Sequence, residues 1–252
     1  MTNHGNAEAA AREDLAAAFQ IAGMLGWDDS IYTHFSVRVP GTKDHFLINP
    51  FGLQFAEVTA SRLVKIDTEG NKIEPSEFDV NPAGFTIHSA IHIGRHDAAC
   101  IVHTHTVSGV AVASLEDGLQ PNNQWGFQFH RRVSYHEFEG IALNLDERDR
   151  IVENLGLTAR ALILRNHGLL TIGRTVPEAF ILMHNLERAC RVQIAVASGA
   201  QKVRQVPIGI QEHTAQQFER VPGSDGEGDL LIREWKAFRR RMEAQVGTDY
   251  LR

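Results

Sequence analysis

Residues 98–105 read Ala-Ala-Cys-Ile-Val-His-Thr-His, an apolar run that ends in two histidines two positions apart. Successive side chains of a strand point to opposite faces, so this spacing places His103 and His105 on the same face. A second apolar run, residues 161–164, leads through Arg165 and Asn166 to His167. Three imidazoles that converge from two strands would leave an open metal position, as a catalytic divalent site requires.

Each motif also has an ordinary explanation. A histidine beside an apolar strand is usually a core or surface residue, and a chain with 13 histidines produces chance pairs. Two motifs that each end an apolar run favour a shared site more strongly than either does alone. Spacing by itself leaves both explanations open.

The composition limits the class of protein. The chain has 252 residues, enough to bury a sizeable core, and its 43% hydrophobic and 22% charged content is ordinary for a globular protein. A net charge of −6 argues against nucleic acid as a partner. The polar first residues lack the apolar core of a secretory signal, and no stretch approaches the roughly 18 apolar residues of a membrane span. We therefore expect no membrane partner. The two cysteines do not form a disulfide framework, so we also expect a cytoplasmic protein.

Helical and strand patterns are mixed along the whole chain, which predicts an α/β sandwich. The pattern loosens after Ala200, where residues 212–220 and 229–246 read as helices around a linker at 222–228. We therefore expect one domain over residues 1–200. Residues 201–252 are expected to form a helical extension that packs on the same domain or on a neighbouring subunit.

The ordered motifs resemble the class II aldolase and adducin family, over about residues 10 to 200. Three segments carry the likeness: Gly-Phe-Thr-Ile-His-Ser-Ala-Ile at 84–91, Ile-Val-His-Thr-His-Thr at 101–106 and Leu-Ile-Leu-Arg-Asn-His-Gly-Leu at 162–169. Residues 135–140 and 176–186 fit the same family. The resemblance implies a three-layer α/β/α sandwich with a mainly antiparallel central sheet, and a homo-oligomer, expected as a tetramer with active sites between subunits.

The resemblance also implies a metal site. In the aldolase branch, the histidines that match His103, His105 and His167 hold zinc, which polarises a carbonyl or enediolate oxygen while a carboxylate moves the proton. Zinc is therefore the expected ion, although imidazole ligands also suit manganese, iron, nickel or cobalt.

The chain departs from the aldolase pattern at three places. Gly84 occupies the position of the catalytic glutamate, and glycine cannot act as a base. Pro82 and Ala83 replace a pair of serines that hold phosphate, and Thr33-His34 replaces a Gly-Asn pair. These stretches resemble the adducin head, which is not known as an enzyme, so cleavage of a phosphorylated ketose is not expected.

We predict a divalent-metal-dependent carbon–carbon lyase, of aldolase or decarboxylase type, acting on a small hydroxy-carbonyl or keto-acid substrate. Three neutral imidazoles on a metal make an electrophile, and decarboxylation needs mainly that electrophile. The candidates for the missing proton-transfer group are His34, Tyr135 and Glu187, with His136 as a further one. The candidates for substrate binding are Asn49, Gly52, Gly84 and Phe85.

The alternative is a non-catalytic binding or scaffold module of the adducin type. In that case the three histidines would pack or bind a structural ion. Against this alternative, all three histidines are present and the chain lacks a long basic tail.

Overall fold

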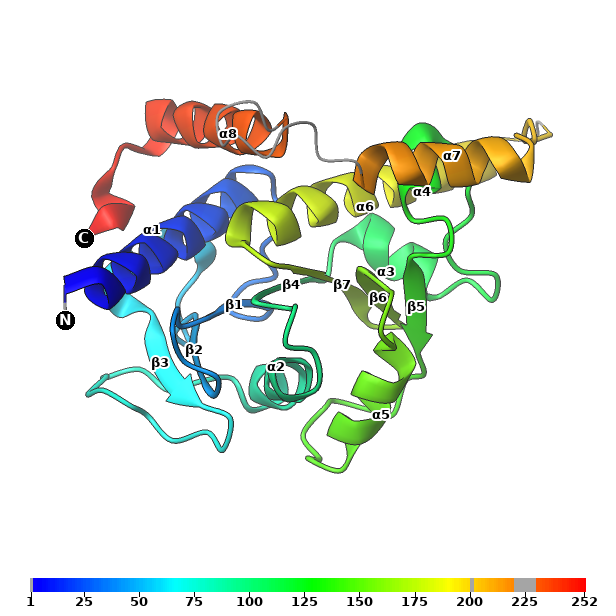
Figure 1. The fold of residues 1–252 in the computed structure, drawn as a ribbon. Coiled ribbons are helices and arrows are strands. Elements are labelled where there is room, and N and C mark those ends of the chain that lie inside the picture. Colours follow the sequence, from blue (N-terminus) through cyan, green and yellow to red (C-terminus); the bar gives the residue numbers. More distant parts are fainter. Residues whose placement is uncertain (1, 200–201, 220–229) are drawn as a thin grey trace.

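The computed structural model describes residues 2–199, 202–219 and 230–252, and the chain is built around a seven-stranded sheet (Figure 1). The order of strands across the sheet is β3-β2-β1-β4-β7-β6-β5. The predicted linker at 222–228 lies outside the described residues. The strands are β1 (His34–Arg38), β2 (His45–Ile48), β3 (Val64–Asp67), β4 (Cys100–Thr104), β5 (Val133–His136), β6 (Ala161–Leu164) and β7 (Gly168–Gly173).

The sheet is mixed, which corrects the prediction of a mainly antiparallel one. Strands β5 and β6 pair in parallel, whereas the other neighbouring pairs are antiparallel. The cause is the connection through helix α5 (Glu147–Leu155), which lies between β5 and β6 in the chain. Parallel neighbours need a crossover of this kind, whereas a tight hairpin gives antiparallel ones.

Helices cover both faces of the sheet, and the predicted α/β architecture with three layers is observed. Helices α1 (Thr2–Met24), α3 (Val107–Ala113) and α6 (Val176–Ala197) lie on one face, and α2 (Pro82–Gly94) and α5 lie on the other (Figure 1). Helix α4 (Gln124–Gln128) lies beside α6. Short 3₁₀ helices are formed by Phe55–Glu57, Ala60–Arg62 and Asp249–Leu251.

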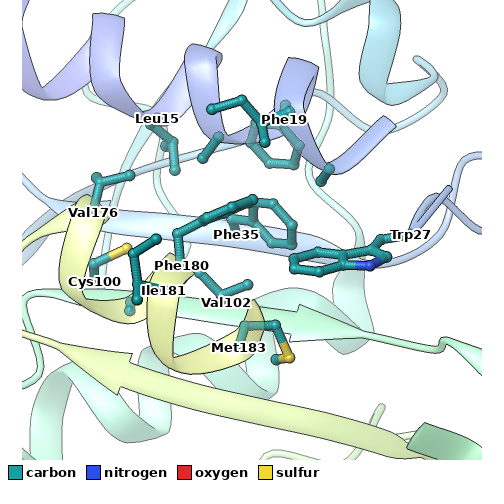
Figure 2. Packing of buried hydrophobic residues seen from close by; sticks show 14 of the residues in the cluster. Leu15, Phe19, Trp27, Phe35, Cys100, Val102, Val176, Phe180, Ile181 and Met183 are labelled. Atoms are coloured by element: carbon teal, nitrogen blue, oxygen red, sulfur yellow. The ribbon is translucent and has the colours of Figure 1, made fainter. Parts of the chain in front are cut away.

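Alternation along β1 and β4 separates an apolar face from a polar one. Phe35 and Val102 point into the larger core beneath α1 and α6, where the Phe19 and Phe35 rings stack at 4.5 Å (Figure 2). Their neighbours in sequence point to the opposite face, toward α2, because side chains alternate along a strand. Ser36 and His103 belong to this second face, and both are fully buried.

Helix α2 begins where the sequence provides a start signal. The Asn81 side chain accepts a hydrogen bond from the backbone N–H of Ala83 at 3.1 Å, and Pro82 occupies the first helical position. Both features are favoured at helix starts. The helix then crosses the sheet face that carries His34 and His103, where it contacts β1.

The last helices extend the layer formed by α1 and α6. Helices α7 (Ile208–Glu219) and α8 (Leu230–Val246) follow the main body (Figure 1). In α8, the Trp235 ring packs on Phe180 at 5.5 Å, and its Nε1 donates a hydrogen bond to Asp14 Oδ1 at 3.3 Å. Among the described residues, no helix has the length and hydrophobicity needed to cross a bilayer.

Candidate metal centre

The three histidines singled out in the sequence come together at one end of β4. His103 lies within β4, His105 follows the strand by one residue, and His167 directly precedes β7, the neighbour of β4. One ring nitrogen from each histidine lies within 4.8 Å of the others. The strand pairing of β4 with β7 therefore converts two distant sequence motifs into one cluster.

Local backbone geometry brings the third imidazole into the cluster. Asn166 has a φ of 56°, a left-handed conformation that asparagine tolerates better than most residues, and His167 N–H donates to Leu164 O at 3.1 Å. Gly168 follows, and a Cβ atom there would lie 2.5 Å from the Thr104 carbonyl oxygen. The sequence Asn166-His167-Gly168 thus provides both the turn and the close approach of the two strands.

Two of the imidazoles are oriented by hydrogen bonds through Nδ1. His103 Nδ1 lies 2.9 Å from the Leu169 carbonyl oxygen, and His105 Nδ1 lies 2.9 Å from Asp29 Oδ2. Their Nε2 atoms face each other at 2.9 Å. An acceptor at Nδ1 places the ring proton there and leaves the Nε2 lone pair free, which is the usual support of a metal-bound histidine.

The protonation state of the cluster suits a divalent cation. Burial, followed by the neighbouring His105, lowers the pKa of His103 well below its usual value. Burial and His105 also lower the pKa of His167 to about 4. Since a metal binds the neutral imidazole, the lowered pKa values of His103 and His167 favour binding of zinc and similar ions.

His34 lies beside the cluster rather than in it. It is the direct cross-strand partner of His103, and the two ring centroids are 4.9 Å apart. Its side chain is buried, and burial followed by His88 lowers its pKa well below the usual range. A Cβ atom on Gly84 would lie 2.6 Å from His34 Cδ2, so the imidazole occupies the space that a side chain at position 84 would need.

Sequence analysis overlooked three polar residues behind His34, namely Ser36, His88 and His92. All three are fully buried or nearly so, between β1 and α2. Burial lowers the pKa of His88 well below the usual value, and burial followed by Arg38 lowers that of His92 to about 3. The four-residue spacing of His88 and His92 was the available signal, because residues four apart share one face of a helix.

The other candidates for proton transfer are engaged elsewhere. The Tyr135 hydroxyl accepts a hydrogen bond from Leu119 N–H at 3.0 Å, and burial raises its pKa. Glu187 accepts hydrogen bonds from the hydroxyls of Thr106 and Ser108, at 2.5 and 2.6 Å, and burial raises its pKa. Thr106 caps α3 directly after His105, so Glu187 anchors the chain just beyond the cluster.

His136 and the candidate substrate residues differ in whether their polar atoms are already hydrogen-bonded and in how close they lie to the three histidines. Both ring nitrogens of His136 are bonded, to Glu147 at 3.1 Å and to Asn154 at 2.8 Å. Asn49 is buried next to Thr33, and its Oδ1 has no hydrogen-bond partner among the described residues. Gly52 has a φ of 99°. Phe85 packs beneath Arg148, whose guanidinium lies 4.8 Å from the ring, rather than against the three histidines.

Comparison with known proteins identifies the family of this chain. Residues 13–194 match the model of the class II aldolase and adducin N-terminal domain. The chain belongs to this family. Its sequence is 41% identical over 234 residues to rat alpha-adducin, a match that covers 91% of this chain and 31% of that protein.

Two solved structures share almost the whole fold. An aldolase II superfamily protein from Pseudomonas syringae superposes with a TM-score of 0.89 at 46% identity, covering 98% of this chain and 96% of the other. An L-fuculose 1-phosphate aldolase from Glaciozyma antarctica gives 0.85 at 30% identity, with coverage of 99% and 95%. The family predicted from the motifs is therefore confirmed.

Proposed function

We propose that this protein is a divalent-metal-dependent carbon–carbon lyase, of aldolase or decarboxylase type, acting on a small hydroxy-carbonyl or keto-acid substrate. The observation that carries the proposal is the convergence of ring nitrogens from His103, His105 and His167 within 4.8 Å of one another. Membership of a family that includes a similar fuculose-phosphate aldolase supports a lyase.

The metal would be held by His103, His105 and His167, with zinc as the expected ion. A bound divalent ion supplies a Lewis acid that draws electrons from a substrate carbonyl or carboxylate oxygen. The carbonyl of Leu169 and the carboxylate of Asp29 hold two of the imidazoles in position. Because manganese, iron, nickel and cobalt also accept imidazole, the donor set alone does not select one ion.

His34 is our choice for the side chain that moves the proton. It lies beside His103, and it fills the space that Gly84 leaves open. We assign positioning roles to Glu187 and Tyr135, because their oxygens already hold hydrogen bonds to Thr106, Ser108 and Leu119. A proton donor next to the metal serves decarboxylation, in which the carbanion left by CO₂ must be protonated.

Substrate would be bound between the cluster and the loop after β2. The unpartnered, buried Oδ1 of Asn49 supports this, because a buried acceptor without a protein partner is rare and a substrate hydroxyl would satisfy it. Gly52 lies in the same loop, and Gly84 borders His34. Phe85 would act only indirectly, through its position next to Gly84 on α2.

A homo-oligomer, expected as a tetramer, completes the proposal. Phe138, Ile141 and Leu143 are more than half exposed on the segment between β5 and α5. Neighbouring exposed apolar side chains of this kind are typical of subunit contacts. Light scattering on the purified protein would give the molecular mass of the assembly.

The alternative function is a binding module, and the 41% identity to rat alpha-adducin favours it. The two functions differ in what they require of the histidines. A lyase needs an accessible metal with an open position, whereas a scaffold needs neither the metal nor His34 in a reactive form.

The deciding experiment is metal analysis by mass spectrometry on protein purified without a metal-affinity tag. We expect about one divalent ion per chain, lost in His103→Ala and retained in His96→Ala, which replaces an exposed histidine. Screening of keto acids and hydroxyaldehydes with the loaded protein would then identify the substrate. Absence of metal even after reconstitution with zinc or manganese would favour the binding module.

A further inference from the structure

A continuous line of hydrogen-bonded side chains leads from the candidate metal centre into the protein. His34 Nδ1 lies 2.8 Å from His88 Nε2, and His88 Nδ1 lies 2.5 Å from Ser36 Oγ. The same Ser36 Oγ lies 2.8 Å from His92 Nε2. We call His34, His88, Ser36 and His92 the histidine chain.

Two regular periodicities create this line. His34 and Ser36 are two positions apart on β1 and share one strand face, whereas His88 and His92 are four apart on α2 and share one helix face. None of the four is more than 3% exposed. Water therefore does not compete for these hydrogen bonds, and burial keeps the imidazoles neutral.

Two arrangements use the Ser36 hydroxyl both as a donor and as an acceptor. A neutral imidazole has one N–H, and a hydroxyl has one O–H, so each link must contain one donor and one acceptor. In the first arrangement every imidazole is protonated on Nε2, and donation runs from His92 through Ser36 and His88 to His34. In the second, every imidazole is protonated on Nδ1, and donation runs in the opposite direction. The second is the less favourable of the two, because His92 Nδ1 is buried and has no hydrogen-bond partner among the described residues, so its proton would be unpaired.

Every other arrangement either places two protons or two lone pairs face to face in a link that water cannot reach, or lets Ser36 accept from both imidazoles. In the latter case the buried Ser36 O–H has no acceptor among the described residues. A buried polar group without a partner is costly enough that mismatched molecules should make up less than about a tenth of the population. The tautomers of the three imidazoles are therefore not independent.

We propose that Ser36, His88 and His92 are positioning residues that fix the tautomer of His34, so that all three histidines of the chain carry their proton on the same ring nitrogen. The consequence concerns His34, the end of the histidine chain that faces the candidate metal centre. His34 Nε2 makes no hydrogen bond within the described part of the protein, so this nitrogen is available to a substrate. The chain decides whether it presents a proton or a lone pair.

Close packing alone does not explain this arrangement. Aliphatic side chains could fill the space between β1 and α2 without four buried polar groups, whose desolvation is unfavourable. The polar line also ends against His103, the residue that faces His34 across the strands. A chain that controls the proton on His34 explains both its polarity and its position.

The test is long-range ¹H–¹⁵N NMR on metal-free protein with ¹⁵N-labelled histidine, because the two ring nitrogens of each tautomer have different shifts. The signals of His34, His88 and His92 are assigned from His→Gln variants. We expect the same protonated nitrogen in all three residues of the unmodified protein. Different tautomers within the chain would overturn the proposal without any variant being needed.

Ser36→Ala removes the hydroxyl that links His88 to His92. We expect His34 and His88 to remain matched, while His92 becomes a mixture of both tautomers. Ser36→Thr keeps a hydroxyl and should restore the common tautomer. Ser89→Ala is the matched control, since Ser89 is a buried α2 serine whose hydroxyl donates to the backbone carbonyls of Phe85 and Thr86 rather than to the histidine chain. An unchanged His92 in Ser36→Ala would also overturn the proposal.

The inference rests on the proposed function only in giving His34 a substrate to act on, and the two can fail separately. Retention of metal in His103→Ala would remove the candidate metal centre while leaving matched tautomers intact. Unmatched tautomers would remove the histidine chain as a unit while leaving metal binding intact.

Discussion

The protein places two groups of histidines side by side on one sheet, and they differ in what their nitrogens do. In the histidine chain, each residue lies inside a regular strand or helix and its neighbours are close enough to form hydrogen bonds. In the candidate metal centre, His105 and His167 lie just outside strand ends, and one ring nitrogen of each of the three histidines lies within 4.8 Å of the others. Clustering alone therefore does not define a metal site; three imidazole nitrogens close enough to share one ion do.

The largest expected effect on stability comes from Gly84, which lies beside His34 where the histidine chain meets the candidate metal centre. Gly→Ala inside a helix normally stabilises by about 0.5–1 kcal/mol. At Gly84 the added Cβ would overlap the His34 ring, which is held between His88 and His103. We expect Gly84→Ala to lower the free energy of unfolding by about 1–3 kcal/mol, measured by urea denaturation.

A double variant separates this clash from a simple helix effect. In a His34→Ala background the overlap is gone, and Gly84→Ala should become neutral or stabilising. Gly5→Ala in α1 is a useful control, because no atom of the described residues lies within 4 Å of a Cβ there. Equal effects of Gly84→Ala with and without His34 would show that the two positions are not coupled.

The second prediction concerns the support of the metal centre. Asp29→Asn keeps the size of the side chain that contacts His105 Nδ1 but removes its charge. Loss of such a partner typically weakens metal binding by about 10–100-fold. Competition with a zinc chelator would measure the loss, and the exposed neighbour Asp28→Asn should bind metal like the unmodified protein.

Much of this contrast was predictable from local sequence patterns. The two apolar runs that end in histidines do form β4 and β6, and the turn residues Asn166 and Gly168 bring His167 next to them. Each of these signals is contained within a few consecutive residues. The Pro82 start of α2 and its His88–His92 spacing were visible in the same way, although sequence analysis used neither as a signal.

What sequence could not provide was the pairing of distant strands. His34 faces His103 only because β1 pairs with β4 in this particular register, and no local pattern specifies that register. The parallel β5–β6 pair was missed for a related reason, since the direction of a strand depends on the route of its connection. In the sequence, Gly84 indicated only that the catalytic glutamate was missing. In the structure, Gly84 leaves the space that the His34 ring occupies.

The third prediction concerns how the buried His92 makes the stability of the protein depend on pH. The folded-state pKa of His92 is about 3, and that of an unfolded histidine is about 6.5. Between these values the unfolded chain binds one more proton at this position, so stability falls as the pH drops below 6.5. In metal-free protein we expect His92→Gln to reduce the slope of unfolding free energy against pH by up to about 1.4 kcal/mol per pH unit between pH 4 and 6.

Urea denaturation at a series of pH values would measure that slope. At pH 8 the histidine is neutral in both states, so the difference between the two proteins there reports only on packing and hydrogen bonding. Parallel curves from pH 8 to pH 4 would mean that His92 takes up its proton in the folded protein as readily as in the unfolded chain.

The smallest effect should come from the turn that presents His167. Asn166 has a φ of 56°, where alanine costs about 1 kcal/mol and glycine almost nothing. We therefore expect Asn166→Ala to lower both thermal stability and zinc affinity, and Asn166→Gly to change neither by much. Because the histidine chain lies on regular β1 and α2, both variants should leave the tautomers of His34, His88 and His92 unchanged in the same NMR spectra. A tautomer change caused by Asn166→Ala would mean that the turn and the chain respond as one unit, and that the two groups of histidines are less separate than their secondary structure indicates.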